Sequence, residues 1–321
     1  MRRCKRSRPS WVPALGLVAT LVIALSMAAC SLPKRYYPVS EESIRDLPVL
    51  DRYVKRIGVA AFMDLSGTAR TDLVRSFEST LSAALGRNCG DVEIVANSAA
   101  DAPAFLKAAS KTASESATES ADTYALAQTA RRSGFQAIVR GRLLSLNHRV
   151  DRSGWASFRE SHHFLDLRLQ AEAVDVVTAA KIIQDSGLIT LPIDEETGAA
   201  IDAGKRFEAP ELVETITETT IDMALKLCGG IRAHPWQTVV KAVRGGEMVL
   251  AARPDAGLAP GDRLAVFDGS RTVTGYDDER FVMAGFRQGT AVIARSSGGE
   301  ILATSEAGGV FPVGSILIPV H

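Results

Sequence analysis

Three histidines that lie close together in the sequence are the first candidates for chemistry. His162 and His163 are adjacent, and His148 lies a short distance before them. Neighbouring residues of a strand point to opposite faces of a sheet, so His162 and His163 cannot bind one metal ion together. If Asp151–Gly154 forms the turn of a hairpin, His148 pairs with a position near 157, well removed from the other two. The sequence therefore predicts a surface hairpin with scattered histidines, and no metal site.

Asp64 and Ser66 follow the first expected strand, at the end where ligands often bind in α/β sheets. Short polar side chains in this place more often cap the next helix, which is expected to begin near Thr68. The acidic run Asp277–Glu279 is expected in a solvated loop. Gly-x-Ser-x-Gly, the P-loop and Gly-x-Gly-x-x-Gly are absent from the sequence. We therefore expect no enzyme and no cofactor.

Cysteines supply the next candidate chemistry. Cys89 and Cys228 each stand at the end of an expected helix, and each is followed by glycine. In an oxidising compartment, two thiols at matching helix ends of one domain suggest a disulfide. Two buried free thiols are the alternative. The sequence leaves both open and favours the disulfide.

The N-terminus has the layout of an export signal. Five basic residues lie within the first eight, without an acidic partner, and no charge occurs from Trp11 to Ala29. Met27-Ala28-Ala29-Cys30 resembles the bacterial lipobox, whose cysteine is acylated and becomes the new N-terminus. The motif predicts lipidation of Cys30, and Ser31 resembles the second residue of lipoproteins sorted to the outer membrane.

Two alternatives to lipidation remain open. The apolar run is about long enough to span a bilayer, so it could stay as an uncleaved anchor. Cys30 could also lie by chance near an ordinary signal-peptidase site. We expect a signal peptide over 1–29 and a proline-containing tether over 30–51. The membrane is then a partner through the N-terminal lipid, with the protein on the periplasmic side of the outer membrane.

Composition limits the remaining possibilities. Without the signal, 292 residues remain, enough for two ordinary domains. Once the five basic signal residues are gone, 32 basic residues face 37 acidic ones, a formal charge of −5. This balance, without an aromatic and basic stripe, excludes a typical nucleic-acid binder. Beyond the signal, no stretch approaches 18 apolar residues.

Hydrophobic patterns predict an α/β domain over 52–230, a mixed sheet covered by helices. Strands are expected at 54–62, 92–96, 135–146, 165–173 and 181–191. Helices are expected after Thr68, over 124–132 and from Pro210, with Gly134 as a C-cap. Two of these helices show residues at helical spacing that would form one buried face. In the helix after Thr68 they are Leu73, Phe77, Leu81, Ala84 and Leu85. In the helix from Pro210 they are Leu212, Ile216, Thr220, Met223 and Leu227. Residues 110–122 are of low complexity, and we expect a mobile loop or a frayed helix start there. The polar stretch 194–205 is expected to lead to the helix from Pro210.

The sequence pattern changes from helical to strand-like at Trp236. Glycines and prolines recur at strand-length intervals through 236–321, with almost no helical periodicity. Gly245-Gly246 and Gly298-Gly299 are hairpin signals, and Leu258–Asp262 resembles a type II turn. This part predicts a small all-β, barrel-like domain.

Two stretches carry a resemblance to a known family. Arg56–Phe62 with the Asp64–Gly67 loop, and the helix, glycine and strand of Leu126–Gly141, are similar to the CsgG/TolB-N-type envelope domain. The distal hairpin leading into Val174–Val177 continues the pattern. The resemblance covers about 150 of the 321 residues. The C-terminal part resembles the C-terminal barrel of flagellar assembly protein T, which combines the same two modules. The resemblance lies in Val239–Leu250, Gly257–Val266 and Gly289–Ile318.

The resemblance implies envelope assembly without catalysis, with other envelope proteins as partners and a homo-oligomeric ring as one arrangement. The alternative is a subunit of a CsgG-like secretion pore. Pore strands need about ten residues that alternate between apolar and polar. Polar groups break that alternation in Trp155–His163, and Asp194–Lys205 is polar throughout. We therefore expect a non-catalytic, lipid-anchored protein that binds or scaffolds envelope partners.

Overall fold

The computed structural model describes residues 52–68, 70–108, 119–154, 160–275 and 279–320. Contacts divide the chain into the units Met1–Glu41 and Glu42–His321. The predicted signal peptide, the tether and Cys30 lie outside the described residues, as do most of 110–122 and Asp277-Asp278. None of the helices in the described part of the chain combines the length and apolar character that crossing a membrane requires.

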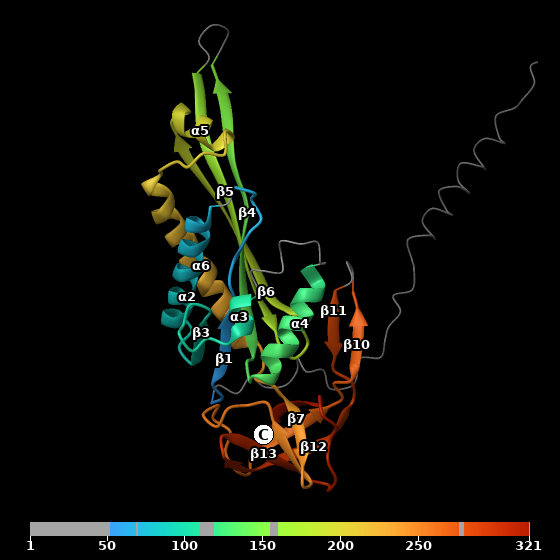
Figure 1. Ribbon diagram of the computed structural model, residues 1–321. Coiled ribbons are helices and arrows are strands. Elements are labelled where there is room, and N and C mark those ends of the chain that lie inside the picture. Colours follow the sequence, from blue (N-terminus) through green and yellow to red (C-terminus); the bar gives the residue numbers. More distant parts are fainter. Residues whose placement is uncertain (1–51, 69, 109–118, 155–159, 276–278, 321) are drawn as a thin grey trace, which may run out of the picture. The chain divides into compact units, whose positions relative to one another are not determined.

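A mixed sheet forms the first part of the second unit, as the sequence predicted (Figure 1). Its strand order is β3-β1-β4-β5-β6, and β2 pairs with β4. β1 runs parallel to β3 and β4, whereas β5 pairs antiparallel with both β4 and β6. The bounds are β1 Lys55–Val59, β2 Met63–Asp64, β3 Val92–Ala96, β4 Ala137–Ser153, β5 Glu160–Asp175 and β6 Lys181–Ile193.

Helices cover both faces of the sheet. α2 (Thr71–Asn88) and α6 (Pro210–Ala233) pack against each other and against one face, where both predicted apolar rows are buried. α3 (Ala104–Ala108) and α4 (Glu119–Arg132) contribute to a second cluster on the other face. Gly58 permits this packing, since a Cβ there would lie 2.8 Å from Leu106 of α3.

The C-terminus of α6 is held by a buried lysine from β1. Lys55 Nζ donates hydrogen bonds to the carbonyl oxygens of Ile231 at 2.8 Å and Arg232 at 2.9 Å, and a further one to His234. The last carbonyls of a helix have no partner within it, and a cation there also complements the helix dipole. Lys55 therefore fixes the end of α6 on the sheet.

β4 and β5 form a hairpin longer than the sequence predicted. The two strands stay paired as far as Ser153 and Glu160, so Asp151–Ser153 belong to the ladder and not to the turn. Charged side chains hold this exposed part together. Arg149 Nε lies 2.8 Å from Asp166 on β5, and Thr190 of β6 donates to the same carboxylate at 2.8 Å. These pairs explain why a polar segment continues as a strand.

The second part is a closed barrel with the strand order β12-β13-β8-β7-β14-β9, and it confirms the predicted small all-β fold. The glycine pairs form the predicted hairpin turns, and Gly261 has the positive φ of 91° that a type II turn requires. β10 and β11 form a separate two-stranded ribbon. The bounds are β7 Thr238–Arg244, β8 Glu247–Leu250, β9 Arg263–Phe267, β10 Arg271–Thr274, β11 Arg280–Met283, β12 Arg287–Ser297, β13 Glu300–Ser305 and β14 Ile316–Val320.

The sheet and the barrel share an apolar cluster. Phe135 and Ile138 from the sheet part are buried together with Val239, Phe267 and Ile316 from the barrel part. Contacts accordingly place both in the single unit Glu42–His321. The separate ranges 52–230 and 236–321 remain a prediction about domains.

Candidate functional site

The structure brings together two of the three histidines that the sequence analysis kept apart. His148 pairs with Leu165, not with a residue near 157, because the turn of the hairpin lies beyond Ser153. His148 and His163 are therefore diagonal neighbours on one face, with His148 Nε2 2.9 Å from His163 Nδ1. His162 points elsewhere and contacts Ser153 Oγ at 3.0 Å. The expected separation of His148 was wrong, and the opposite directions of His162 and His163 were right.

The two imidazoles meet edge to edge. Their ring centres are 5.1 Å apart and their planes differ by 11°, which with a 2.9 Å nitrogen separation fits an in-plane hydrogen bond. His148 Nδ1 also lies 2.9 Å from Asp202 Oδ2. Both hydrogen bonds can form when His148 Nδ1–H donates to Asp202 and His163 Nδ1–H donates to His148 Nε2. A zinc ion between these nitrogens would need about 2.0–2.1 Å to each, more room than the pair provides.

Asp202 belongs to a helix that the sequence analysis missed. α5 (Glu195–Asp202) occupies the stretch expected to be a polar connection, and Asp194 caps it by accepting from Thr197 N at 2.6 Å. Gly198 faces His148, whose ring atoms lie 2.5–2.9 Å from the position of an added Cβ. The histidine pair thus fastens α5 to β4 and β5. No cluster of three or more His, Cys, Asp or Glu side chains suited to a metal occurs in the described ranges.

Asp64 and Ser66 organise their own loop. Asp64 Oδ1 accepts from Ser66 N at 2.9 Å, and Asp64 Oδ2 accepts from Arg70 N at 3.0 Å. α2 begins at Thr71, and its N-cap residue Arg70 makes no side-chain capping bond. The polar pair therefore shapes the entry into the helix, three residues later than predicted, and both side chains are occupied by these contacts.

Cys89 and Cys228 are joined by a disulfide, as the sequence predicted. Cys89 directly follows α2 and Cys228 lies in the last two turns of α6, with their Cα atoms 5.2 Å apart. Both residues are buried in the core between the helices and the sheet. The bond closes a separation of 139 residues, so it links the beginning of the sheet part to its end.

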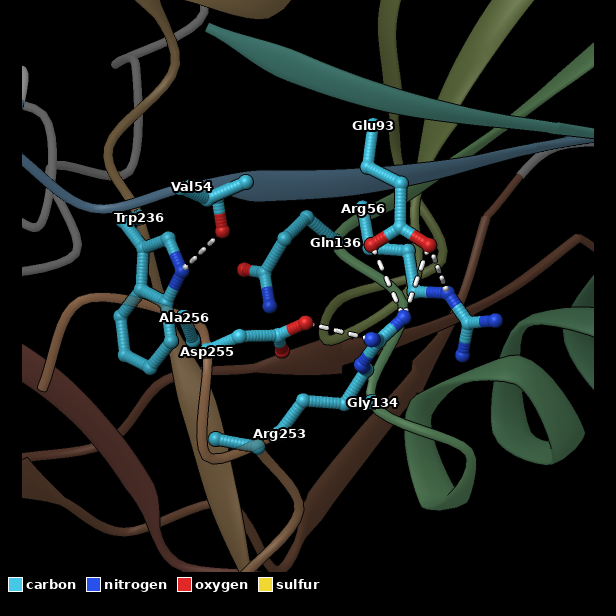
Figure 2. A pocket seen from close by; sticks show the side chains of 10 residues that line it. Val54, Arg56, Glu93, Gly134, Gln136, Trp236, Arg253, Asp255 and Ala256 are labelled. Carbon is cyan, nitrogen blue, oxygen red and sulfur yellow. Dashed lines mark hydrogen bonds and ion pairs between the residues drawn. The ribbon is translucent and has the colours of Figure 1, made fainter.

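A small pocket lies where the sheet part meets the barrel part (Figure 2). It has a volume of about 250 Å³, part of which is open to solvent. Arg253 from the barrel part crosses it and donates to both carboxylate oxygens of Glu93 on β3, at 2.7 and 3.0 Å. Arg56 Nε lies 3.3 Å from the same carboxylate and its guanidinium stacks on Phe135 at 4.5 Å. The polar groups of the pocket are thus largely paired with one another.

Hydrogen bonds that involve backbone groups close the other side of this pocket. Trp236 Nε1 donates to Val54 O at 3.2 Å, and Val54 N donates to Ala256 O at 3.1 Å. Gln136 Oε1 accepts from Gln237 N at 3.2 Å. These contacts, drawn in part in Figure 2, join the residues just before β1 and β4 to the residues before β7 and to the loop after β8. The place is therefore a joint between the two parts.

A buried carboxylate lies near the same joint. Asp175 ends β5 and accepts hydrogen bonds from Val177 N and Thr178 N, each at 3.0 Å, while His234 Nε2 is 3.7 Å away. Burial alone would raise the pKa of Asp175, but the nearby His234 and the hydrogen bonds from Thr178 and Val177 hold the pKa below the ordinary value. Asp175 is thus kept ionised in the interior.

Another carboxylate is buried on the face of the sheet opposite α6. Glu172 of β5 is 1 % exposed and lies 2.7 Å from Arg142, 3.5 Å from Lys181 and 3.7 Å from Arg140. No sequence pattern indicated this cluster, because its members come from three strands whose register was unknown. Alternating charged residues in an otherwise apolar strand were the available signal.

Comparisons with known proteins give distant structural similarity alone. No protein-family model matches the sequence, and no curated protein matches it. Lipoprotein GNA1162 from Neisseria meningitidis is 11 % identical, with a TM-score of 0.30, over 54 % of this chain and 99 % of that one. The hypothetical protein CT253 from Chlamydia trachomatis is 10 % identical, with a TM-score of 0.34, over 55 % and 97 %.

A minor lipoprotein from Acinetobacter baumannii is 12 % identical, with a TM-score of 0.26, over 56 % of this chain and 93 % of that one. Two of these three proteins are thus described as lipoproteins. Overlaps with TM-scores of this size carry no argument about family or function. The CsgG/TolB-N-type resemblance remains a prediction from the residues.

Proposed function

We propose that this chain is a non-catalytic, lipid-anchored protein of the bacterial envelope that scaffolds partner proteins from the periplasmic side. The disulfide between Cys89 and Cys228 carries the proposal. Of the four cysteines, Cys4 lies in the signal and two are paired, so Cys30 remains as the lipid acceptor. A structural disulfide also fits an oxidising compartment. Ser31 favours the outer membrane as the final location.

The scaffold part of the proposal is supported by how the described residues are used. The histidine pair fastens α5, Asp64 and Ser66 shape a loop, and the pocket residues join the sheet to the barrel. Each candidate group is thereby engaged in holding the fold. The resemblance to envelope-assembly domains points the same way, toward binding of other envelope proteins.

Lipidation is tested by replacing the acceptor. In the native host, the wild-type chain should incorporate labelled palmitate and have an intact mass that begins at acylated Cys30. Cys30→Ser should incorporate no label and should keep the mass of residues 1–29, because acylation precedes cleavage of a lipoprotein signal. Cys4→Ser is the matched control, since that cysteine leaves with the signal, and it should behave as wild type.

Either of two results would contradict the anchor: label in Cys30→Ser, or an unlabelled wild type whose mass includes the signal. Scaffolding is tested separately by cross-linking in intact cells and identifying the attached envelope proteins. Ion conductance of the purified lipidated chain in planar bilayers would instead support a pore and overturn the scaffold proposal.

A further inference from the structure

The outer strand of the sheet, β6, presents a long edge with unused hydrogen-bonding groups. β6 pairs with β5 on one side and ends the strand order on the other. Its 13 residues make it much longer than the opposite edge strand β3, which has 5. An exposed strand edge is a template for pairing with another strand, and proteins usually protect such edges.

The hydrogen bonds of β5 identify which backbone groups of β6 point outward. Asp175 N donates toward the β6 side, to Ala180 O, whereas Val176 N donates toward the β4 side, to Gln136 O. Along β5, odd-numbered residues therefore bond to β6. Their partners on β6 are also odd-numbered, from Ile183 to Ile193. The even-numbered residues of β6 accordingly direct N–H and C=O away from the sheet.

Proline at position 192 gives an independent check. Proline has no N–H, and within sheets it occurs where that group would have faced outward from an edge strand. Pro192 is even-numbered and pairs with Phe164, as this assignment requires. Among the described residues, no hydrogen bond is found for the outward backbone groups of Ser186, Leu188 and Thr190.

The centre of this edge lacks the usual protection. From Ser186 to Leu191 the strand has no charge, no proline and no bulge. Leu188 lies in the middle, and it is 61 % exposed. Charges and proline occur at the ends, at Lys181, Asp185 and Pro192. An edge without charge or bulge and with an exposed leucine at its centre is a template for pairing with another strand.

We propose that the β6 edge pairs antiparallel with β6 of a second copy of this chain, about a twofold axis at Leu188. This deepens the proposed function, on which it rests, by naming one partner of the scaffold. In this register Leu188 lies opposite Leu188 of the other copy, and Ser186 lies opposite Thr190. Gln184 lies opposite Pro192, where the missing N–H removes one bond from each outer pair.

The edge is complementary to itself in this register, which favours a second copy as the occupant. No like charges oppose each other in this register. On the other side of the strand, Gly187 would lie opposite Ile189 and Asp185 opposite Leu191. Asp185 is already paired with Lys226 of α6 at 2.9 Å, so it brings no unpaired charge to the contact. A twofold contact needs such a self-complementary surface.

The first test removes the leucine at the centre. The chain is expressed from residue 30 onward, with Cys30→Ser so that it carries neither signal nor lipid, and its mass in solution is measured by sedimentation velocity. The wild-type edge should give a particle of twice the chain mass. Leu188→Lys places two cations on the axis and should give single chains. Val313→Lys is the matched control, because Val313 is 64 % exposed but lies in a barrel loop, and it should keep the dimer.

The second test fixes the register and does not depend on the fold surviving Leu188→Lys. Thr190→Lys lies beside Asp166 of β5, so the lysine is tolerated within one copy. Ser186→Lys with Thr190→Lys puts like charges opposite each other across the axis and should weaken the dimer by about tenfold or more. Ser186→Glu with Thr190→Lys puts opposite charges there and should restore the dimer.

A wild-type chain that sediments as single chains at all accessible concentrations overturns the inference. So does a dimer that neither Leu188→Lys nor the lysine pair affects. Because these experiments use the unlipidated chain, their failure leaves the palmitate result at Cys30 untouched. A negative palmitate result likewise leaves the sedimentation result untouched.

Discussion

Asp175 is a single side chain whose ionisation makes the stability of this fold depend on pH. Its carboxylate is fully enclosed and accepts hydrogen bonds from the turn that follows β5, with His234 nearby. The ionised form is favoured by these bonds even though burial opposes it, so the pKa in the folded state lies below the ordinary value of 3.8.

A carboxyl group whose pKa is lowered by folding stabilises the fold above its unfolded pKa, and this contribution is lost as the pH falls through the folded pKa. We therefore expect Asp175→Asn to lower the free energy of unfolding at pH 7. The difference from wild type should shrink below about pH 4, where the unfolded carboxyl takes up its proton. Urea unfolding at pH 7 and pH 3 measures it. An equal or larger difference at pH 3 would contradict this account.

The histidines show what the sequence could and could not reveal at the scale of single residues. Strand alternation correctly separated His162 from His163. The distance between His148 and His163 depended on the turn, which was expected at Asp151–Gly154. Cross-strand pairs such as Arg149 with Asp166 extend the ladder beyond that point. Register is set by such distant pairings, so spacing along the chain could not supply it.

At the scale of elements, a close contact links β4 to the loop after β1. A Cβ at Gly141 would lie 2.2 Å from the ring of Phe62, and that ring packs edge-on against Phe77 of α2 at 4.9 Å. The absence of a side chain in the middle of β4 therefore allows an aromatic pair to join the sheet to its helix.

Gly141→Ala should accordingly lower the free energy of unfolding by about 1–3 kcal/mol, because the ring of Phe62 must move within a packed core. Gly86→Ala is the matched control. Nothing lies within 4 Å of a Cβ at Gly86, and alanine favours the helix, so stability should rise by about 0.5–1 kcal/mol. Thermal or urea unfolding of both variants decides the matter. Equal effects in the two would show that Gly141 is not constrained by Phe62.

The disulfide ties α2 to α6 across the core. Cys89→Ala with Cys228→Ala should lower the free energy of unfolding by about 5 kcal/mol, the chain-entropy value for so long a closed loop. Unfolding in urea under non-reducing conditions measures the loss. Peptide mapping of the wild type should find the two cysteines linked. A double variant as stable as wild type, or free thiols in the map, would contradict the structural role.

Periodicity predicted the long elements well. The buried rows of α2 and α6, the strand at Val92–Ala96 and the all-β character after Trp236 all follow from local pattern. α5 was missed because its eight residues are too few to show a helical period. Its signal was present in Asp194 as the cap and in the acidic first turn of Glu195 and Glu196. The alternating Arg140 and Arg142 of β4 were the local signal of the ion cluster at Glu172, but the partners depended on strand register.

At the scale of the whole molecule, the joint between sheet and barrel combines buried apolar side chains with ion pairs at its rim. Glu93 accepts from Arg253 across the joint and contacts Arg56 within the sheet part. The side chains of Glu93 and Arg253 are 36 % and 38 % exposed, so solvent and salt weaken their attraction. The buried side chains beneath them, including Phe135 and Val239, supply the larger contribution.

Glu93→Gln should therefore lower the free energy of unfolding by no more than about 1 kcal/mol at low salt, and by less at high salt. Glu300→Gln is the control, since Glu300 is 34 % exposed, about as much as Glu93, and its ion pair with Arg244 lies within the barrel. Its effect on the sheet-to-barrel contact should be nil. Urea unfolding at two ionic strengths compares them. A loss in Glu93→Gln that is insensitive to salt would contradict the electrostatic account.

The fluorescence of Trp236 can report whether sheet and barrel are in contact, because its indole lies in the joint. The indole is 2 % exposed, stacks near Tyr53 with ring centres 5.5 Å apart, and donates to Val54 across the joint. Beyond the predicted signal peptide, which contains Trp11, the sequence has one other tryptophan, Trp155, so Trp155→Phe leaves a single indole emitter. Its fluorescence should be blue-shifted and shielded from soluble quenchers while sheet and barrel stay in contact. A red shift that precedes loss of circular dichroism would record the two parts separating before either unfolds.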